Sequence, residues 1–206
     1  GVRLQRVKDF SAVRGATIAF RRGNHRIGTA TTDADGYAIL DWTPAERGVH
    51  EFTARVSAVA DQADQGALSV EPSPLVVSAQ SKDRRFVVID LDHTVVDAPF
   101  WRVLLLRGGE AMADSVDVTR RIARKYGIIY LTHRPDLLTR KSKTWLYRHR
   151  FPAGPLLVSE LKDVLDSGKF KSGKLRAVRE AFPRVAIGIG DKISDAAAYV
   201  ANGLDA

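Results

Sequence analysis

Two aspartates stand two residues apart directly after an apolar run, in the stretch VVIDLDHTVVD over residues 87–97. A carboxylate is ionised at neutral pH and can attack phosphorus without prior activation. Asp90 is therefore a candidate nucleophile. Asp92 is a candidate general acid and base, which would protonate a leaving alkoxide and later deprotonate water. An EF-hand calcium loop fits less well, because Thr94 and Val95 stand where that loop needs an acid and a glycine.

Four further residues of suitable chemistry follow later apolar runs of the chain: Thr132, Lys171, Asp191 and Asp195. The hydroxyl of Thr132 and the amine of Lys171 could hold the equatorial phosphoryl oxygens, where charge is concentrated in the transition state. A hard cation such as Mg²⁺ would remove the repulsion between a carboxylate and a phosphate, and it prefers carboxylate ligands. The candidate metal ligands are Asp90, Asp92, Asp191 and Asp195.

Each of these residues also has a purely structural interpretation. Thr132 could be the N-cap of a helix. Lys171 lies in a polar stretch between an apolar run and the next helical pattern, and it could be an ordinary exposed lysine. Asp195 could be an acid in the first turn of a helix, with Ser194 as a cap. The chemical interpretation is favoured because all of these residues fall where one sheet would gather them.

The elements that would position these residues lie in the second half of the chain. Four apolar runs predict buried strands: Phe86–Ile89, Ile128–Leu131, Leu156–Val158 and Val185–Ile189. Helical patterns lie between them, at about Asp114–Tyr126, Pro135–Arg150 and Lys171–Phe182. Apolar strands that alternate with helices predict a parallel α/β sheet of Rossmann type. Such sheets bind ligands beyond the carboxyl ends of their strands, which is where the acids, hydroxyl and amine are expected to meet.

The first half, residues 1–80, has a different pattern. Short alternating segments are separated by the turn signals RGN at residues 22–24 and DADG at residues 33–36. They predict a small antiparallel sandwich, and the pattern resembles bacterial immunoglobulin-like modules. Asp33 and Asp35 fit a tight turn better than a calcium loop, because the further acidic ligands of an EF-hand are missing. A polar linker is expected at residues 79–83.

The motifs of the second half resemble those of the haloacid dehalogenase (HAD) superfamily. DLDHTVVD is similar to its first motif, DxDxT, and YLTHR supplies the threonine of the second. FKSGK supplies the lysine of the third, and GDKISD is similar to the fourth, GDxxSD. The resemblance covers residues 84–206 and implies a HAD-like phosphatase domain with Mg²⁺ and an aspartyl-phosphate on Asp90. It also implies one more strand after the fourth motif, so a truncated C-terminal edge is expected.

A narrower resemblance concerns YLTHRPDLLTRKSKTWLYRHRFPAGPLLVS, residues 130–159. It is similar to the phosphatase domain of lipins and to the related C-terminal domain of phosphatidylinositol transfer proteins. Those domains carry a Phe-Lys pair after the third strand, which selects Lys171 over Lys169 and Lys174. Lipin-like domains act on phosphatidate, whereas some relatives in transfer proteins bind lipid phosphate without known turnover. The short connections between the motifs further imply a minimal cap and an open site, which suits large or membrane-bound phosphoesters.

Four residues beside the motifs are predicted substrate contacts: His93, Thr94, His133 and Arg134. His93 stands where the first motif often has a glycine, so its side chain is expected at the entrance. No pair of histidines has the spacing of a histidine metal site. The segment 100–106 could be a flap over the site or a core element. The basic and aromatic helix at 140–150 could dock on an anionic surface or simply cover the sheet.

Composition limits the classes of site and the partners that the chain can have, but it does not identify the compartment. The 206 residues are 45% hydrophobic, which is enough for one large domain or two small ones. The absence of cysteine excludes disulfides, zinc-thiolate sites and thiol catalysis. A net charge of +8 favours anionic partners, namely a phosphoester substrate and an anionic phospholipid surface, with nucleic acid less favoured. No membrane-length apolar run or signal peptide is visible, so a soluble or peripheral protein is expected. Because the chain begins with Gly1, it is expected to be a processed product or a fragment.

The sequence therefore predicts a Mg²⁺-dependent phosphomonoester hydrolase that acts through an aspartyl-phosphate, with a phospholipid such as phosphatidate as substrate. One alternative is a module that binds phospholipid phosphate without turnover. Another is a phosphatase without a cap that acts on soluble, protein or nucleic-acid phosphoesters. Retention of both Asp90 and Asp92 favours an enzyme over a binding module.

Overall fold

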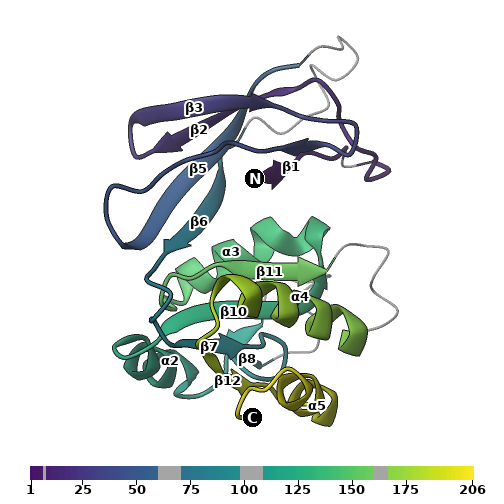
Figure 1. Ribbon diagram of the computed structural model, residues 1–206. Coiled ribbons are helices and arrows are strands. Elements are labelled where there is room, and N and C mark those ends of the chain that lie inside the picture. The colour runs from purple at the N-terminus through teal and green to yellow at the C-terminus, as the bar shows by residue number, and fades with distance from the viewer. Residues whose placement is uncertain (7, 60–70, 98–108, 160–166) are drawn as a thin grey trace. The chain divides into compact units, whose positions relative to one another are not determined.

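The computed structural model describes residues 1–6, 8–59, 71–97, 109–159 and 167–206, except that the side chains of residues 167–169 are not described. The chain divides into two compact units, Gly1–Val77 and Ser78–Ala206 (Figure 1). The predicted flap at residues 100–106 lies outside the described residues. No helix in the described ranges has both the length and the apolar character that crossing a lipid bilayer requires.

The first unit is built from antiparallel strands. Their bounds are β1 (Val2–Arg3), β2 (Thr17–Arg22), β3 (His25–Thr31), β4 (Tyr37–Ala38), β5 (Gly48–Ala58) and β6 (Ser73–Ala79). A four-stranded sheet has the order β3-β2-β5-β6, and β1 pairs with β4. Its core contains Ile18, Phe20, Ala38 and Ala54. The predicted immunoglobulin-like nature of residues 1–80 stays a prediction.

The turn at Asp33 is held by its own side chain. Asp33 Oδ1 accepts hydrogen bonds from the backbone N–H groups of Asp35 and Tyr37, both at 2.9 Å. Gly36 has φ of 81°, a left-handed conformation that glycine adopts without strain. These contacts are those of a tight turn, which agrees with the turn interpretation of this acidic cluster.

The second unit contains a parallel sheet with the order β11-β10-β7-β12. Its main strands are β7 (Phe86–Ile89), β10 (Gly127–Pro135), β11 (Leu156–Ser159) and β12 (Val185–Ile189). Its helices are α2 (Ser115–Ala123), η2 (Asp136–Leu138), α3 (Thr139–Arg148), α4 (Ser167–Ala181) and α5 (Ile193–Ala201). The short strands β8 (Val96–Asp97) and β9 (Glu110–Ala111) pair with each other beside this sheet. The mixed α/β class with a parallel sheet is confirmed.

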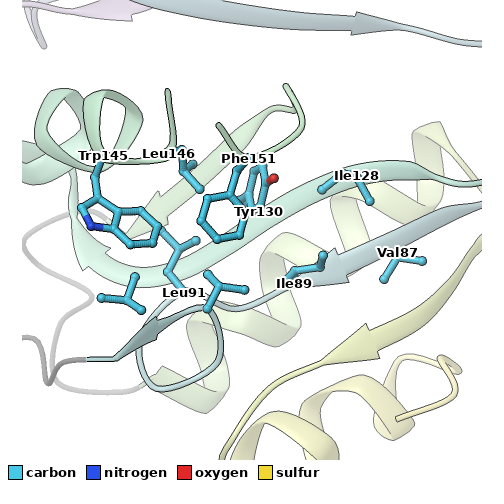
Figure 2. Packing of buried hydrophobic residues seen from close by; sticks show 10 residues of the cluster. Val87, Ile89, Leu91, Ile128, Tyr130, Trp145, Leu146 and Phe151 are labelled. Carbon is cyan, nitrogen blue, oxygen red and sulfur yellow. The ribbon is translucent and has the colours of Figure 1, made fainter. Parts of the chain in front are cut away.

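Strand β7 is central and is buried on both faces, because its side chains alternate between two hydrophobic layers. Val87 and Ile89 belong to a hydrophobic cluster that also includes Trp145 and Leu146 of α3 (Figure 2). The intervening residues Phe86 and Val88 belong to the opposite layer, whose other members lie largely on α4 and α5. Each β7 side chain is 1% exposed, and full burial of such a side chain stabilises the fold by about 1.5–3 kcal/mol. The carboxyl end of this strand is therefore held firmly.

Helix α3 covers one layer of the sheet. Trp145 and Leu146 are buried, and the Trp145 Nε1–H donates to the carbonyl oxygen of Gly109 at 2.6 Å. Tyr147 is 78% exposed on the other side of the helix. The sheet-covering interpretation of this basic helix is confirmed for its apolar residues, and docking on an anionic surface stays a prediction.

Two predicted boundaries differ from the structure. Strand β10 runs on to Pro135 rather than ending at Leu131, so Thr132 and Arg134 lie on a strand and not at a helix start. Helix α4 begins at Ser167, so Lys171 lies inside a helix and not in the polar stretch before one. Lys171 and Leu175 are one helical turn apart and both are buried, which places the amine on the inner face.

Candidate active site

Asp90 and Asp92 lie on a tight turn that follows β7. The Asp90 N–H donates to the Ile189 carbonyl oxygen at 2.9 Å, which ties the end of β7 to β12. The carbonyl oxygen of Leu91 accepts hydrogen bonds from the N–H groups of Val95 and Val96. His93 has φ of 59°, a left-handed conformation in which histidine is found more often than most residues. The turn fixes both acids at the carboxyl end of the central strand.

Lys171 joins two of the buried carboxylates. Its Nζ donates to Asp90 Oδ1 at 3.0 Å and to Asp195 Oδ1 at 2.6 Å. All three residues are at most 4% exposed. Burial alone would lower the pKa of Lys171, but the charge of Asp90 and hydrogen bonds with Asp195 and Asp90 raise it above its ordinary value. The amine is therefore a cation held between two acids, and an ammonium group has a third N–H for another acceptor.

Asp90, Asp191 and Asp195 form a carboxylate group that fits a divalent cation. Each offers one oxygen, and these oxygens lie within 4.8 Å of one another. Within the described residues, the buried Asp195 Oδ2 has no hydrogen-bond partner. An added Cβ on Gly190 would lie 2.8 Å from that oxygen, so the glycine is what allows Asp195 to approach. Three carboxylates with a free buried oxygen match the oxygen donors that Mg²⁺ prefers.

Asp92 does not belong to this carboxylate group, and its role as a metal ligand stays a prediction. Arg134 Nε donates to Asp92 Oδ1 at 3.1 Å and to Oδ2 at 3.0 Å, and Nη2 donates to Oδ1 at 2.6 Å. The Thr132 hydroxyl lies 3.4 Å from Oδ2 and donates to it. The carboxylate of Asp92 is therefore engaged by two side chains of β10, Thr132 and Arg134.

The four predicted substrate contacts have different surroundings. His93 is exposed beside Asp92, as expected for an entrance residue. Thr94 Oγ1 is buried and has no partner among the described residues. The His133 ring lies 5.7 Å from that of Phe170, which places it against α4. Arg134 is 1% exposed, and its guanidinium group pairs with Asp92.

Two residues of the site were not predicted. Ser142 is fully buried and accepts a hydrogen bond from Arg134 Nη1 at 3.0 Å. Its signal was present, because it precedes Trp145 and Leu146 by three and four residues and so shares their inward helix face. Gly190 belongs to the fourth motif, and its close approach to Asp195 exists only in the folded chain.

Burial raises the pKa of Asp90 to about 6, although the charge and hydrogen bond of Lys171 oppose the rise and the charges of Asp195 and Asp92 add to it. The ordinary value is 3.8, so between these values the folded protein binds more protons than the unfolded chain. Without metal, the free energy of unfolding is therefore expected to fall by about 2 kcal/mol as the pH rises from about 4 to about 7.

Urea unfolding in EDTA at pH 4 and pH 7 would measure this contribution. Asp90→Asn cannot ionise at this position, so its stability relative to the unchanged protein should improve by about 2 kcal/mol between the two pH values. Asp97→Asn, at an exposed acid on β8, is the matched control and should follow the unchanged protein. Parallel pH profiles for the unchanged protein and Asp90→Asn would contradict the expected cost of ionising Asp90.

Comparisons with known proteins found one matching family and several similar solved structures. Residues 87–206 match the family model described as PITM 1-3, LNS2 domain. A chain from the Pnkp1/Rnl/Hen1 RNA repair complex has a TM-score of 0.54 at 12% identity, over 70% of this chain and 50% of that chain. The class C acid phosphatase from Bacillus anthracis, solved with tungstate, has a TM-score of 0.44 at 22% identity, over 54% and 53%. The chain thus spans about half the length of each of these two structures. The similarity to the chain from the RNA repair complex concerns the fold alone. A search of curated proteins found no match.

Proposed function

Because the chain belongs to the LNS2 domain family over residues 87–206, we propose that it hydrolyses phosphomonoesters through an aspartyl-phosphate on Asp90. Membership of this family supports a phosphatase-type domain. The observation that carries the proposal is the arrangement at the carboxyl end of β7. There a buried acid, Asp90, is paired with Lys171, and a second acid, Asp92, stands two residues away and is 15% exposed through its side chain.

The proposed reaction has two steps. A carboxylate oxygen of Asp90 attacks phosphorus, the bond to the ester oxygen breaks, and Asp92 gives its proton to the leaving alkoxide. Water then attacks the phosphorus of the aspartyl-phosphate and gives a proton to Asp92. The bond between phosphorus and Asp90 breaks, which releases inorganic phosphate and restores both acids. Lys171 keeps a positive charge beside the attacking carboxylate throughout.

Asp90, Asp191 and Asp195 would hold the divalent cation, for which we propose Mg²⁺. Such an ion, when bound, neutralises charge on the phosphoryl oxygens and lets a carboxylate approach them. Lys171 already pairs with Asp90 and Asp195, so the cation would add to a partly neutralised group rather than to bare acids.

The substrate class that we propose is a phospholipid with a terminal phosphate, such as phosphatidate. The resemblance to lipin-type domains supports it. So does the rim of the site, where Asp191 is followed by the exposed Lys192 and by Ile193, which is 90% exposed at the start of α5. A cation beside an exposed apolar side chain suits a phosphate headgroup that is attached to acyl chains.

The test measures phosphate release with Mg²⁺ from vesicles that contain phosphatidate and from a panel of soluble phosphoesters. Release from vesicles that Asp90→Asn abolishes would support the lipid reaction. Release from soluble esters alone would support the proposed reaction and would argue against a phospholipid as the substrate. No Asp90-dependent release from either, by a folded chain, would leave a binding module as the better interpretation.

A second pair of variants separates lipid contact from chemistry. Ile193→Ser should lower hydrolysis of vesicles and leave hydrolysis of soluble esters unchanged. Val200→Ser is the matched control, because Val200 is 63% exposed on the same helix and lies about two turns beyond Ile193, toward the end away from Asp191. If Ile193→Ser and Val200→Ser hydrolysed phosphatidate in vesicles at equal rates, Ile193 would not be a specific contact of the lipid.

A further inference from the structure

Arg134 is the largest fully buried side chain of the protein among the described residues. A buried guanidinium is costly unless each of its nitrogens finds an acceptor. Nε and Nη2 donate to the carboxylate of Asp92, and Nη1 donates to the Ser142 hydroxyl. The charge is thus paired, and the pairing is with one of the two acids of the proposed reaction.

The contact restrains the carboxylate of Asp92 in direction as well as in place. Nε lies 3.1 Å and 3.0 Å from the two carboxylate oxygens, and Nη2 lies 2.6 Å from Oδ1. Arginine presents these N–H groups in a rigid plane, so two nitrogens on one carboxylate fix its rotation. Lysine, a single point charge on a flexible stem, cannot do the same.

The arginine is itself fixed from behind. Its backbone N–H donates to Thr132 Oγ1 at 3.2 Å, and the same hydroxyl donates to Asp92. Ser142 anchors Nη1 from helix α3 and is fully buried. A chain of contacts therefore runs from α3 through Arg134 to Asp92, and all the parts behind the carboxylate are excluded from water.

We infer that Arg134 is a positioning residue, which acts through Asp92 and not on the substrate. It orients the Asp92 carboxylate so that a proton can pass between Asp92 and the leaving oxygen. This inference rests on the proposed function. It predicts that replacement of Arg134 lowers the rate of hydrolysis most for the esters whose leaving group needs that proton most.

The experiment uses the full chain, Mg²⁺ and a series of substituted phenyl phosphates whose leaving phenolates differ in basicity. For Arg134→Lys, we expect a loss of kcat/KM of about 10²-fold with the most basic leaving group, because correctly placed general acids contribute about 10²–10⁴-fold. The loss should be much smaller for a dinitrophenyl ester, which needs no proton. Ser142→Ala keeps the contact with Asp92 and should show the same trend with a smaller loss. Arg148→Lys, at an exposed arginine of α3, should leave all rates unchanged.

A double-mutant cycle tests whether Arg134 acts through Asp92. In an Asp92→Asn background, Arg134→Lys should cost little further activity with any ester. The inference would be overturned if Arg134→Lys lowered kcat/KM by the same factor for every phenyl phosphate. It would also be overturned if Arg134→Lys lowered kcat/KM by the same factor in the Asp92→Asn background as in the unchanged protein. Either result would leave the proposed function intact. If circular dichroism shows that Arg134→Lys is unfolded, Ser142→Ala tests the inference instead, because its loss of kcat/KM should also grow with the basicity of the leaving group. If the unchanged protein releases no phosphate in an Asp90-dependent manner, the proposed function fails and this inference fails with it.

Discussion

Asp90→Asn is expected to lower the rate of phosphate release by about 10⁴-fold or more, a size typical of removing a nucleophile. The amide has nearly the same shape as the carboxylate but lacks the ionised oxygen that attacks phosphorus. The variant should therefore still bind a phosphoester and yet form no aspartyl-phosphate. Incubation with a ³²P-labelled ester followed by an acid quench would show labelled protein for the unchanged chain and none for the variant.

Two controls separate lost chemistry from lost structure. Asp97→Asn removes an exposed acid seven residues further along the chain and should retain both rate and label. Circular dichroism and thermal unfolding should show that Asp90→Asn is folded, since it removes a buried acid whose ionisation is itself costly. A folded Asp90→Asn variant that still incorporates label would show that another residue is the nucleophile.

The strands of the parallel sheet were predictable because they are apolar throughout. Phe86–Ile89 and Val185–Ile189 coincide with β7 and β12, and both are bounded by polar or turn residues that stop the apolar pattern. The extension of β10 beyond Leu131 was not predictable in this way. Its last residues include Thr132 and Arg134, whose polar groups are satisfied by contacts with Asp92 that only the folded chain provides.

In the site, the sequence also indicates which residues come together, but not which contacts they make with one another. Parallel strands gather their carboxyl ends at one edge, so an acid such as Asp90 and a lysine such as Lys171 could be expected to meet. Their order along the chain does not say which acid takes which partner. The side-chain oxygens of Asp92 pair with Arg134, whereas the metal-type group of carboxylates consists of Asp90, Asp191 and Asp195. Side-chain direction across a turn depends on backbone geometry, here the left-handed His93, which the residue types alone do not specify.

Removal of Lys171 is expected to be the most damaging single change to the stability of the second unit. In the described part of the chain, the lysine supplies the ion pairs of Asp90 and Asp195, and all three side chains are at most 6% exposed. Removing one partner of a buried ion pair leaves an uncompensated charge and typically costs about 3–5 kcal/mol. Lys171→Met, which keeps an unbranched side chain one atom shorter and without charge, should therefore unfold at a much lower urea concentration in EDTA at pH 7.5.

The same variant separates electrostatic loss from packing loss. At pH 5, protonation of Asp90 should relieve part of the repulsion, because the pKa of this acid is already raised to about 6 by burial. Mg²⁺ should also restore stability at pH 7.5, because a ligand that binds only the folded chain shifts the equilibrium toward it. Lys174→Met is the matched control, since Lys174 lies one turn further along α4, with its ammonium group 5.8 Å from the centre of the Phe170 ring. A loss that neither acid nor Mg²⁺ relieves would mean that the methionine disrupts packing. A larger loss of stability for Lys174→Met than for Lys171→Met would mean that Lys174, and not Lys171, is the lysine that stabilises the site.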